Sequence, residues 1–337
     1  MNDKKVILSI NQLHVKFKGK QSTDHILRGI SFSIKEGERI AIVGESGCGK
    51  SFTAKSILGI LPKKAKKEGE IIYKGKNILQ IPEREMRRIR GREIGIIFQD
   101  PMTSLNPTMK IGKQILEAYI IHNPGTNYSQ AKAKTIDLLN LVGIPEPHLR
   151  YHQYPHELSG GMRQRIMIAI ALAPSPSLLI ADEPTTALDV TIQAQILDLL
   201  KEIQNRSKKS ILLITHDLSL VAGFCEKVLV MYAGQIIEFA TVENIFSRPK
   251  HPYTKLLLNS LPNLDKVLDK LHFIEGSPPG LNQIFEGCSF FNRCPSRLKR
   301  CQNQLPKWHV LSPCHKVLCS LFDKTPSEEA SDENTPD

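Results

Sequence analysis

The sequence of 337 residues predicts an α/β fold built on a wound, mostly parallel sheet with an antiparallel β subdomain and a helical subdomain. A small cysteine-rich C-terminal extension is expected to follow it. Three observations support this prediction. Apolar runs typical of buried strands alternate with helical runs over residues 1–245. A glycine-rich loop joins one of these strands to a helix, and five of the seven cysteines fall within residues 288–319.

The glycine-rich loop spans residues 44–51 and reads Gly-Glu-Ser-Gly-Cys-Gly-Lys-Ser, between a β-branched run at 40–43 and a helical run at 52–61. Small residues let backbone N–H groups turn toward a polyphosphate, and the following helix adds its positive end. In such a loop Lys50 reaches the β- and γ-phosphates and the Ser51 hydroxyl suits Mg²⁺. A glycine-rich turn that binds nothing is the alternative, but the complete pattern between a strand and a helix favours nucleotide binding.

The residues before this loop predict a small antiparallel sheet beside it. Short β-type runs lie at 6–8, 13–17 and 30–34, and a further run follows the loop at 70–73. Phe17 ends one of them and is placed to stack on adenine, although an aromatic residue there is as often ordinary packing. The basic run Lys63, Lys64, Lys66 and Lys67 is interpreted as a solvated loop.

The remaining elements follow from the period of the apolar residues. Helical spacing is present at 111–121, 130–143, 162–173 and 192–203. Strand-like runs are present at 94–98, 178–181, 211–215, 228–232 and 235–239.

Polar residues at the ends of these strands carry the predicted chemistry. Phosphoryl transfer to water requires a held Mg²⁺, an oriented water and compensation of charge on the γ-phosphate. Asp182 ends a buried strand and suits Mg²⁺, and Glu183 could polarise the water. Gln99 is expected near Mg²⁺ and the water, and His216 near the γ-phosphate. An acidic pair at a strand end is weak evidence alone, but it is strong evidence downstream of a complete phosphate-binding loop.

A second small-residue stretch, Ser159, Gly160 and Gly161, begins another helix and predicts a second anion site. One nucleotide does not need two such loops from one chain. It does need both if the second loop reaches the γ-phosphate bound to another subunit.

The ordered set of 44–51, Gln99, 158–161, 178–183, 187–189 and His216 resembles the ATP-binding cassette family over about residues 5–245. The resemblance implies a P-loop ATPase fold and a head-to-tail dimer. In it two ATP molecules lie between the P-loop of one subunit and the signature loop of the other. Met162 departs from the glutamine usual in the signature, but Ser159 and the glycines are present.

By this resemblance, residues are assigned as follows. The expected catalytic residues are Glu183, His216 and Gln99, and the expected Mg²⁺ residues are Ser51, Gln99 and Asp182. The expected ATP-binding residues are Phe17, Gly44, Glu45, Ser46, Gly47, Cys48, Gly49, Lys50, Ser51, Phe52, Gln99, Ser159, Gly160, Gly161, Asp182 and the D-loop residue Asp189.

A narrower resemblance is to the ATPases of peptide and nickel importers, carried by residues 98–107, 158–165, 187–197 and 251–254. Met102 and Met162 favour the D-type ATPase subunit of oligopeptide or dipeptide permeases over its F-type partner. The resemblance implies ATP hydrolysis that drives peptide uptake. Implied partners are an F-type ATPase or a second copy of this chain, two transmembrane permease subunits, and indirectly an extracytoplasmic peptide-binding protein. The helical subdomain, about 100–165, would contact the permease at the cytoplasmic face of the inner membrane.

Composition agrees with a cytoplasmic, peripheral protein. The sequence contains no apolar run of about 18 residues, and the N-terminus lacks the apolar core of a signal peptide. The net charge of +11 permits a nucleic-acid partner. A nucleic-acid-associated cassette ATPase is therefore an alternative, but the chain has one cassette and no heptad run, so no nucleic-acid partner is expected. A nickel or other solute importer remains open, whereas a P-loop kinase leaves 159–161 and His216 unexplained.

The C-terminal extension, residues 246–322, is predicted to be short and proline-broken, with no acidic residue from 287 to 322. Its proposed metal ligands, with spacings C-x5-C-x6-C-x12-C, are Cys288, Cys294, Cys301 and Cys314.

Four soft thiolates suit Zn²⁺ or an iron–sulfur cluster, and the spacing is not the C-x2-C pair of zinc ribbons. The family resemblance points to [4Fe–4S], with Zn²⁺ as the alternative. Cys319 is a close alternative to Cys314, and Cys48 and Cys225 are interpreted as plain thiols. The acidic tail at 323–337 is expected to be disordered.

Overall fold

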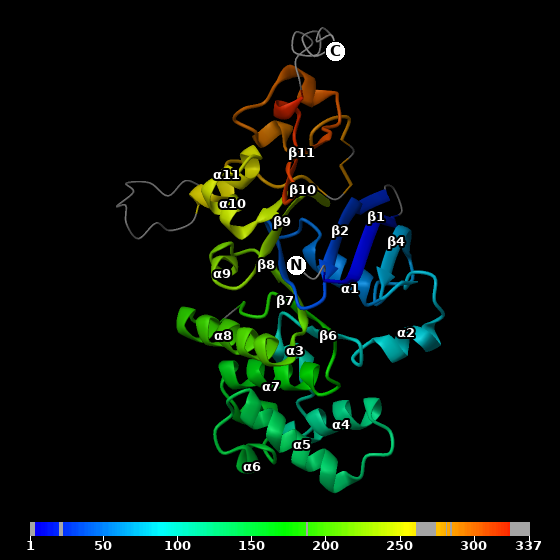
Figure 1. Cartoon of the computed structure of the whole chain (residues 1–337), viewed down its shortest axis with the longest axis vertical. Helices are drawn as coiled ribbons and strands as arrows, with labels where there is room; N and C mark the ends of the chain where they lie inside the picture. Colours follow the sequence, from blue (N-terminus) through cyan, green and yellow to red (C-terminus); the bar gives the residue numbers. More distant parts are fainter. Residues whose placement is uncertain are drawn as a thin grey trace.

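The computed structural model describes residues 4–19, 23–186, 188–260, 274–280, 282–283 and 285–323. The predicted α/β fold is confirmed in this part of the chain. It contains an eight-stranded sheet in the order β11-β12-β10-β9-β3-β8-β7-β6 and a four-stranded sheet in the order β2-β1-β4-β5. Figure 1 shows the antiparallel sheet to one side of the large sheet, with helices α4–α7 at one end of the molecule and β11 toward the other.

The large sheet has a parallel centre. β3 lies between β8 and β9 and is parallel to both, and β7 continues the parallel arrangement from β8 to β6. Every residue of β7 and β8 is buried, as expected for strands covered on both faces. The strands are β3 (Arg39–Val43), β6 (Ile94–Ile97), β7 (Leu178–Asp182), β8 (Ser210–Thr215), β9 (Lys227–Tyr232), β10 (Gln235–Thr241), β11 (Trp308–Ser312) and β12 (His315–Leu318).

The smaller sheet has longer strands than the sequence predicted. It is made of β1 (Val6–Lys18), β2 (Thr23–Lys35), β4 (Ala65–Tyr73) and β5 (Lys76–Asn77). The runs at 6–8 and 13–17 form one strand because an irregularity in the register between Ile10 and Leu13 carries the strand across its polar residues. The loop interpretation of the basic run was wrong for Lys66 and Lys67, which pair with β1 on β4.

The helices predicted at 111–121, 130–143, 162–173 and 192–203 are all present, with boundaries shifted by a few residues. The helix after the glycine-rich loop begins earlier than predicted, at Lys50. The helices are α1 (Lys50–Ile57), α2 (Glu83–Ile89), α3 (Pro101–Ser104), α4 (Ile111–His122), α5 (Tyr128–Leu141), α6 (Pro147–Arg150), α7 (Gly160–Leu172), α8 (Val190–Ser207), α9 (Ser219–Ala222), α10 (Val242–Ser247) and α11 (Pro252–Asn259). Short 3₁₀ helices are η1 (Pro155–Glu157), η2 (Phe291–Arg293), η3 (Lys299–Gln302) and η4 (Ser320–Phe322).

The C-terminal extension is more regular than its composition suggested. It contributes α11 and the β11–β12 hairpin, and β12 pairs with β10 of the large sheet. The prolines suggested that this region contains no helix. Pro252, however, occupies the first turn of α11, where proline is tolerated. Of the acidic tail, only Asp323 belongs to the described residues, so the disorder prediction for 324–337 lies outside them.

Alternate residues of β3 face two apolar cores. Ile40 and Ile42 pack into the core shared with the antiparallel sheet and α1, whereas Ala41 and Val43 pack into the core shared with the helices. Because both faces of β3 are fixed, the loop that follows it leaves the sheet at a defined point.

Candidate functional site

The loop at 44–51 leaves the end of β3 and enters α1, as the motif predicted. Two positions of this loop require glycine because the backbone there lies close to neighbouring strands. A Cβ added at Gly44 would lie 2.1 Å from the Met231 carbonyl oxygen, and Gly49 has a φ of 110° and lies against Leu27 and Ile26. Larger residues would therefore displace the loop from β9 and β2.

Lys50 is held inside the loop. Its Nζ donates to the carbonyl oxygens of Gly44 at 2.8 Å and Glu45 at 3.0 Å, and lies 3.8 Å from Glu183 Oε1. The side chain is only 4% exposed. A buried ammonium between carbonyl oxygens and one carboxylate is well placed to exchange these partners for phosphate oxygens.

Ser51 and Asp182 meet across the end of the sheet. The Ser51 hydroxyl donates to Asp182 Oδ1 at 3.0 Å. Burial is the main cause that raises the pKa of Asp182, and the hydrogen bond from Ser51 opposes it. A buried carboxylate beside a hydroxyl provides two oxygen donors of the type that Mg²⁺ prefers.

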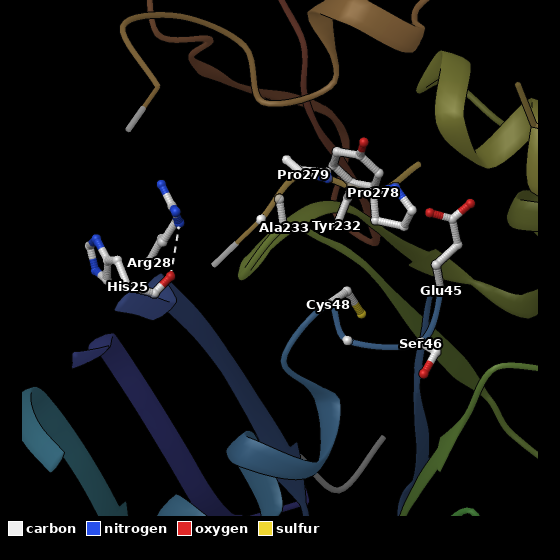
Figure 2. Close-up of a pocket in the computed structure, with 11 residues that line it drawn as sticks. His25, Arg28, Glu45, Ser46, Cys48, Tyr232, Ala233, Pro278 and Pro279 are labelled. Atoms are coloured by element: carbon white, nitrogen blue, oxygen red, sulfur yellow. Dashed lines mark hydrogen bonds between the residues drawn. The ribbon is translucent and has the colours of Figure 1, made fainter. Parts of the chain in front are cut away.

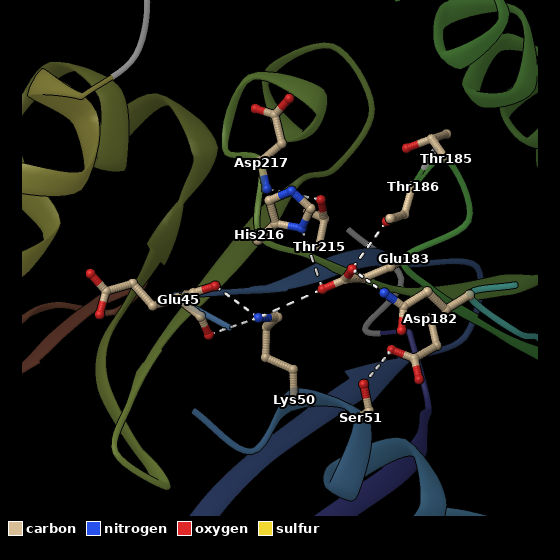
Figure 3. A network of polar contacts seen from close by, with 12 residues as sticks. Glu45, Lys50, Ser51, Asp182, Glu183, Thr185, Thr186, Thr215, His216 and Asp217 are labelled. Carbon is tan, nitrogen blue, oxygen red and sulfur yellow. Dashed lines mark hydrogen bonds and ion pairs between the residues drawn. The ribbon is translucent and has the colours of Figure 1, made fainter. Parts of the chain in front are cut away.

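Glu183 is the point on which the polar residues of the site converge (Figure 3). Gln99 donates to its Oε2 at 2.9 Å and the Thr186 hydroxyl donates to the same atom at 3.0 Å. His216 Nδ1 lies 3.4 Å from Oε1. The structure thus brings together residues from the ends of β7 and β8, from α1 and from the loop after β6, which are far apart along the chain. Thr186 was not predicted, although it lies in the same loop as Glu183.

Phe17 lies beside the end of the glycine-rich loop that enters α1. Its ring makes an edge-to-face contact with Phe52, with ring centroids 5.7 Å apart. Phe52 follows Ser51 directly, so this aromatic pair lies next to the start of α1. The arrangement offers an apolar surface beside the phosphate-binding loop.

The Ser159 loop is separate from this cluster. Ser159 caps α7, accepting a hydrogen bond from the Met162 N–H at 3.3 Å, and Ser159 and Gly160 are exposed. Asp189 is likewise exposed and caps α8 through the Ile192 N–H at 2.9 Å. Among the described residues, no hydrogen bond or ion pair joins Ser159 or Asp189 to the loop at 44–51. These exposed groups are free to contact a second molecule.

The C-terminal extension contacts the glycine-rich loop directly, which the sequence did not reveal. Arg293 forms two hydrogen bonds to the Glu45 carboxylate, at 2.7 and 2.9 Å, and the Tyr253 hydroxyl accepts from the Glu45 N–H at 2.9 Å. No spacing rule relates residues 45, 253 and 293. A cavity of about 180 Å³ lies between this loop and Pro278–Pro279 (Figure 2).

Three of the four predicted thiol ligands lie together. Burial, and then the charges of Cys301 and Cys294, raise the pKa of Cys288 to about 11. The pKa of Cys319 is also raised to about 11, by burial and by the charges of Cys288, Cys294 and Cys301. Cys319, which the sequence offered as the alternative to Cys314, thus lies near the other three thiols.

Strand β12 explains the difference. Cys314 lies in the turn before β12 and Cys319 follows its last residue. Their Cα atoms are thus roughly 15 Å apart along an extended chain. Within the described residues, no group of three or more His, Cys, Asp or Glu side chains is arranged so that it could hold a metal ion. Burial raises the pKa of Cys48 to about 11 and also raises that of Cys225, in agreement with plain thiols.

No helix in the described part of the chain combines the length and hydropathy that a membrane span requires.

The chain is similar in sequence to two protein families and to named transport proteins, and similar in fold to a solved ATP-binding cassette. The ABC transporter family matches residues 27–186, and the C-terminal region of oligopeptide/dipeptide transporters matches residues 237–301. The dipeptide transport ATP-binding protein DppD of Bacillus subtilis is 50% identical over 320 residues, covering 94% of this chain and 95% of its own length. The oligopeptide transport ATP-binding protein OppD of the same organism is 49% identical, covering 94% and 89%. The ADP- and Pi-bound dimer of the ATP-binding cassette MJ0796 matches with a TM-score of 0.64 and 26% identity, over 70% of this chain and 98% of that chain.

Proposed function

The chain belongs to the ABC transporter family and to its oligopeptide/dipeptide branch, and from this premise we propose how its residues bind and hydrolyse ATP. It is the ATP-hydrolysing subunit of a peptide importer. The observation that carries the proposed mechanism is the convergence of Lys50, Gln99, Thr186 and His216 on the Glu183 carboxylate.

ATP is proposed to lie along the P-loop, residues 44–51. Its adenine stacks on Phe17 near Phe52, and its phosphates meet the backbone N–H groups of the loop and Lys50. In this binding mode Lys50 Nζ exchanges the carbonyl oxygens of Gly44 and Glu45 for phosphate oxygens.

Ser51, Asp182 and Gln99 are proposed to hold Mg²⁺. The Ser51–Asp182 hydrogen bond already orients two of these three oxygen donors. Bound there, the ion would neutralise charge on the β- and γ-phosphates.

Glu183 is proposed to accept a hydrogen bond from the attacking water and so to orient it toward the γ-phosphate. Gln99 and Thr186 fix the carboxylate, and His216 can move from it to the γ-phosphate because its side chain is 55% exposed. The side chain of Glu183 is 12% exposed, so bulk water has little access to this carboxylate.

The exposed Ser159, Gly160 and Asp189, together with the partly exposed Gly161, are proposed to complete the ATP site of a second ATPase in a head-to-tail dimer. The exposure of the Ser159 helix start, and its separation from this chain's own P-loop, support that arrangement. An F-type ATPase or a second copy of this chain would be the partner.

The assembled transporter is proposed to contain two permease subunits in the inner membrane and to receive peptides from an extracytoplasmic binding protein. This chain would lie at the cytoplasmic face, with about residues 100–165 against the permeases. We assign residues 1–245 to the ATPase domain, 246–322 to the C-terminal extension and 323–337 to a tail.

Reconstitution tests this function. The chain, its partner ATPase and the permeases are placed in vesicles, and ATP hydrolysis is measured with and without peptide-loaded binding protein. Peptide is expected to stimulate hydrolysis, and Lys50→Ala is expected to abolish both hydrolysis and uptake. Hydrolysis that responds to neither permeases nor peptide would contradict the proposal.

We further propose that Cys288, Cys294, Cys301 and Cys319 hold a soft metal centre, [4Fe–4S] or, as the alternative, Zn²⁺. The Cys288 N–H donates to the Cys301 carbonyl oxygen at 2.8 Å, which brings two of these residues together, and the charges of Cys288, Cys294 and Cys301 help to raise the pKa of Cys319. Arg297 is one basic neighbour, lying close enough to affect Cys294, and would offset the negative charge of a thiolate-bound centre.

Metal analysis after anaerobic purification tests this assignment. Cys319→Ser is expected to lose the metal and Cys314→Ser to retain it, because Cys314 lies in the turn at the other end of β12. Retention in Cys319→Ser together with loss in Cys314→Ser would restore the ligand set read from the sequence. Iron with sulfide would distinguish the cluster from zinc.

A further inference from the structure

The contact between the C-terminal extension and the P-loop is built around one arginine. The side chain of Arg293 is 7% exposed and meets the Glu45 carboxylate in a two-pronged ion pair. Figure 2 shows the Glu45 side chain extending from the loop toward the segment of the extension that carries Pro278. The ion pair links residues 248 positions apart in the sequence.

The remaining donors of Arg293 are also used. Nε donates to the Glu275 carbonyl oxygen at 3.0 Å, Nη2 to the Ile274 carbonyl oxygen at 3.3 Å, and Nη1 to the Tyr232 hydroxyl at 3.3 Å. With the two bonds to Glu45, five contacts match the five N–H groups of a guanidinium. The arginine is therefore fixed from the extension and from β9, and its position determines that of Glu45.

The backbone of Glu45 is fixed by the same extension. Its N–H donates to the hydroxyl of Tyr253, a fully buried residue of α11. Tyr253 packs against Tyr232 and Phe290, and Phe290 lies directly before η2, which ends at Arg293. One aromatic cluster thus supports both groups that hold Glu45.

Charge gives this contact a consequence for the P-loop. Glu45 is the one acidic residue within residues 44–51. An uncompensated carboxylate there would repel a polyphosphate bound a few residues away. Arg293 neutralises it and turns it away from the loop.

We propose that Arg293 is a positioning residue of the ATP site, which holds Glu45 and compensates its charge so that the P-loop can receive the phosphates. This inference rests on the proposed function of the P-loop. The C-terminal extension then contributes to ATP binding within the same chain, in addition to any role of its thiols.

The test is a set of binding and turnover measurements on the full chain. Arg293→Met is expected to weaken Mg·ATP binding, measured by calorimetry, by about tenfold or more, because a displaced loop loses aligned phosphate contacts. KM for ATP should rise while kcat at saturating ATP stays near its original value. The double variant R293M/E45Q should regain most of the affinity, because the uncompensated carboxylate is gone.

Arg300→Met is the matched control. Arg300 also ties the extension together, donating from Nη2 to the Ser320 carbonyl oxygen at 2.7 Å, but among the described residues it forms no hydrogen bond or ion pair with the P-loop. Its affinity for ATP should remain unchanged even if its melting temperature falls. Equal weakening by Arg300→Met, or no recovery in R293M/E45Q, would overturn the inference. Unmodified protein that fails to bind ATP would instead refute the proposed function.

Discussion

At the scale of single residues, Glu183 shows how the fold imposes a conformation for chemistry. Its φ is 49°, in the left-handed region, and this backbone conformation costs any residue other than glycine about 1 kcal/mol. Its N–H donates to the Ile214 carbonyl oxygen at 2.8 Å, which holds the backbone there. The turn points the carboxylate at Gln99 and Lys50 rather than along β7.

Glu183→Gln should therefore separate binding from turnover. The amide keeps the size of the side chain but cannot accept a proton or polarise water equally, so the hydrolysis rate should fall on the order of a hundredfold or more. Mg·ATP binding should persist, and a closed dimer should accumulate in gel filtration with ATP. Lys50→Ala serves as the contrast, because it should lose nucleotide binding. Near-normal turnover of Glu183→Gln would remove Glu183 from its role.

Motifs predicted the residues around Glu183 because each lies at a strand end or in a loop with a recognisable local pattern. Thr186 and Arg293 had no such pattern, and the resemblance at 251–254 gave no contact for Tyr253. The partners of Tyr253 and Arg293 come from tertiary contacts, whereas Thr186 lies three residues from Glu183. Cys314 and Cys319 were indistinguishable by chemistry. Because β12 separates the two along the chain, we propose that only one of them faces the other thiols.

At the scale of elements, α11 shows how the extension is attached. His251 caps this helix, with Nδ1 accepting from the Tyr253 N–H at 3.0 Å. Its own N–H donates to Glu238, a fully buried carboxylate on β10 that also contacts His315 Nε2 at 2.8 Å. One strand of the ATPase thus binds α11 and β12 together. The sequence did not predict these elements because the prolines and short runs obscured their periodicity.

The cap makes stability depend on pH. Burial lowers the pKa of His251 to about 3, from an ordinary value of 6.5. Between pH 6.5 and pH 3, His251 is therefore protonated in the unfolded chain but neutral in the folded chain. The contribution of His251 to the free energy of unfolding is complete above pH 6.5 and decreases as the pH falls toward 3. The loss is about 2 kcal/mol at pH 5.

His251→Asn should remove this dependence, because asparagine also caps helices but does not titrate. Urea unfolding at pH 7.5 and pH 5 measures it. The exposed His148→Asn is the control and should keep the original pH dependence. An unchanged acid sensitivity in His251→Asn would show that another group is responsible.

At the scale of the whole molecule, the proposed dimer draws on two separate loops of this chain. Among the described residues, no hydrogen bond or ion pair joins the loop at 44–51 to Ser159. The large-sheet architecture was predictable from the alternation of strands and helices. The addition of β11 and β12 to that sheet was not, because both strands are short and β11 is largely exposed.

Ser159→Arg tests the dimer. A bulky cation at the start of α7 should block the approach of a second ATPase and lower hydrolysis on the order of a hundredfold. This chain's own affinity for ATP should stay within a fewfold of its original value. Ser207→Arg, at the exposed end of α8, is the control for adding an arginine. A large loss of ATP affinity in monomeric Ser159→Arg would place Ser159 at its own P-loop and contradict the head-to-tail arrangement.

The order of strands in the large sheet also has a consequence during synthesis. β3, which carries the P-loop, lies between β8 and β9, and both come from the second half of the chain. A nascent chain that has left the ribosome only as far as α7 contains the whole P-loop but neither strand that flanks it. Such long-range pairing delays folding and leaves apolar strands uncovered meanwhile. ATP can stabilise only the finished sheet, so until β9 has emerged the first half of the chain depends on chaperones or on its antiparallel sheet for protection.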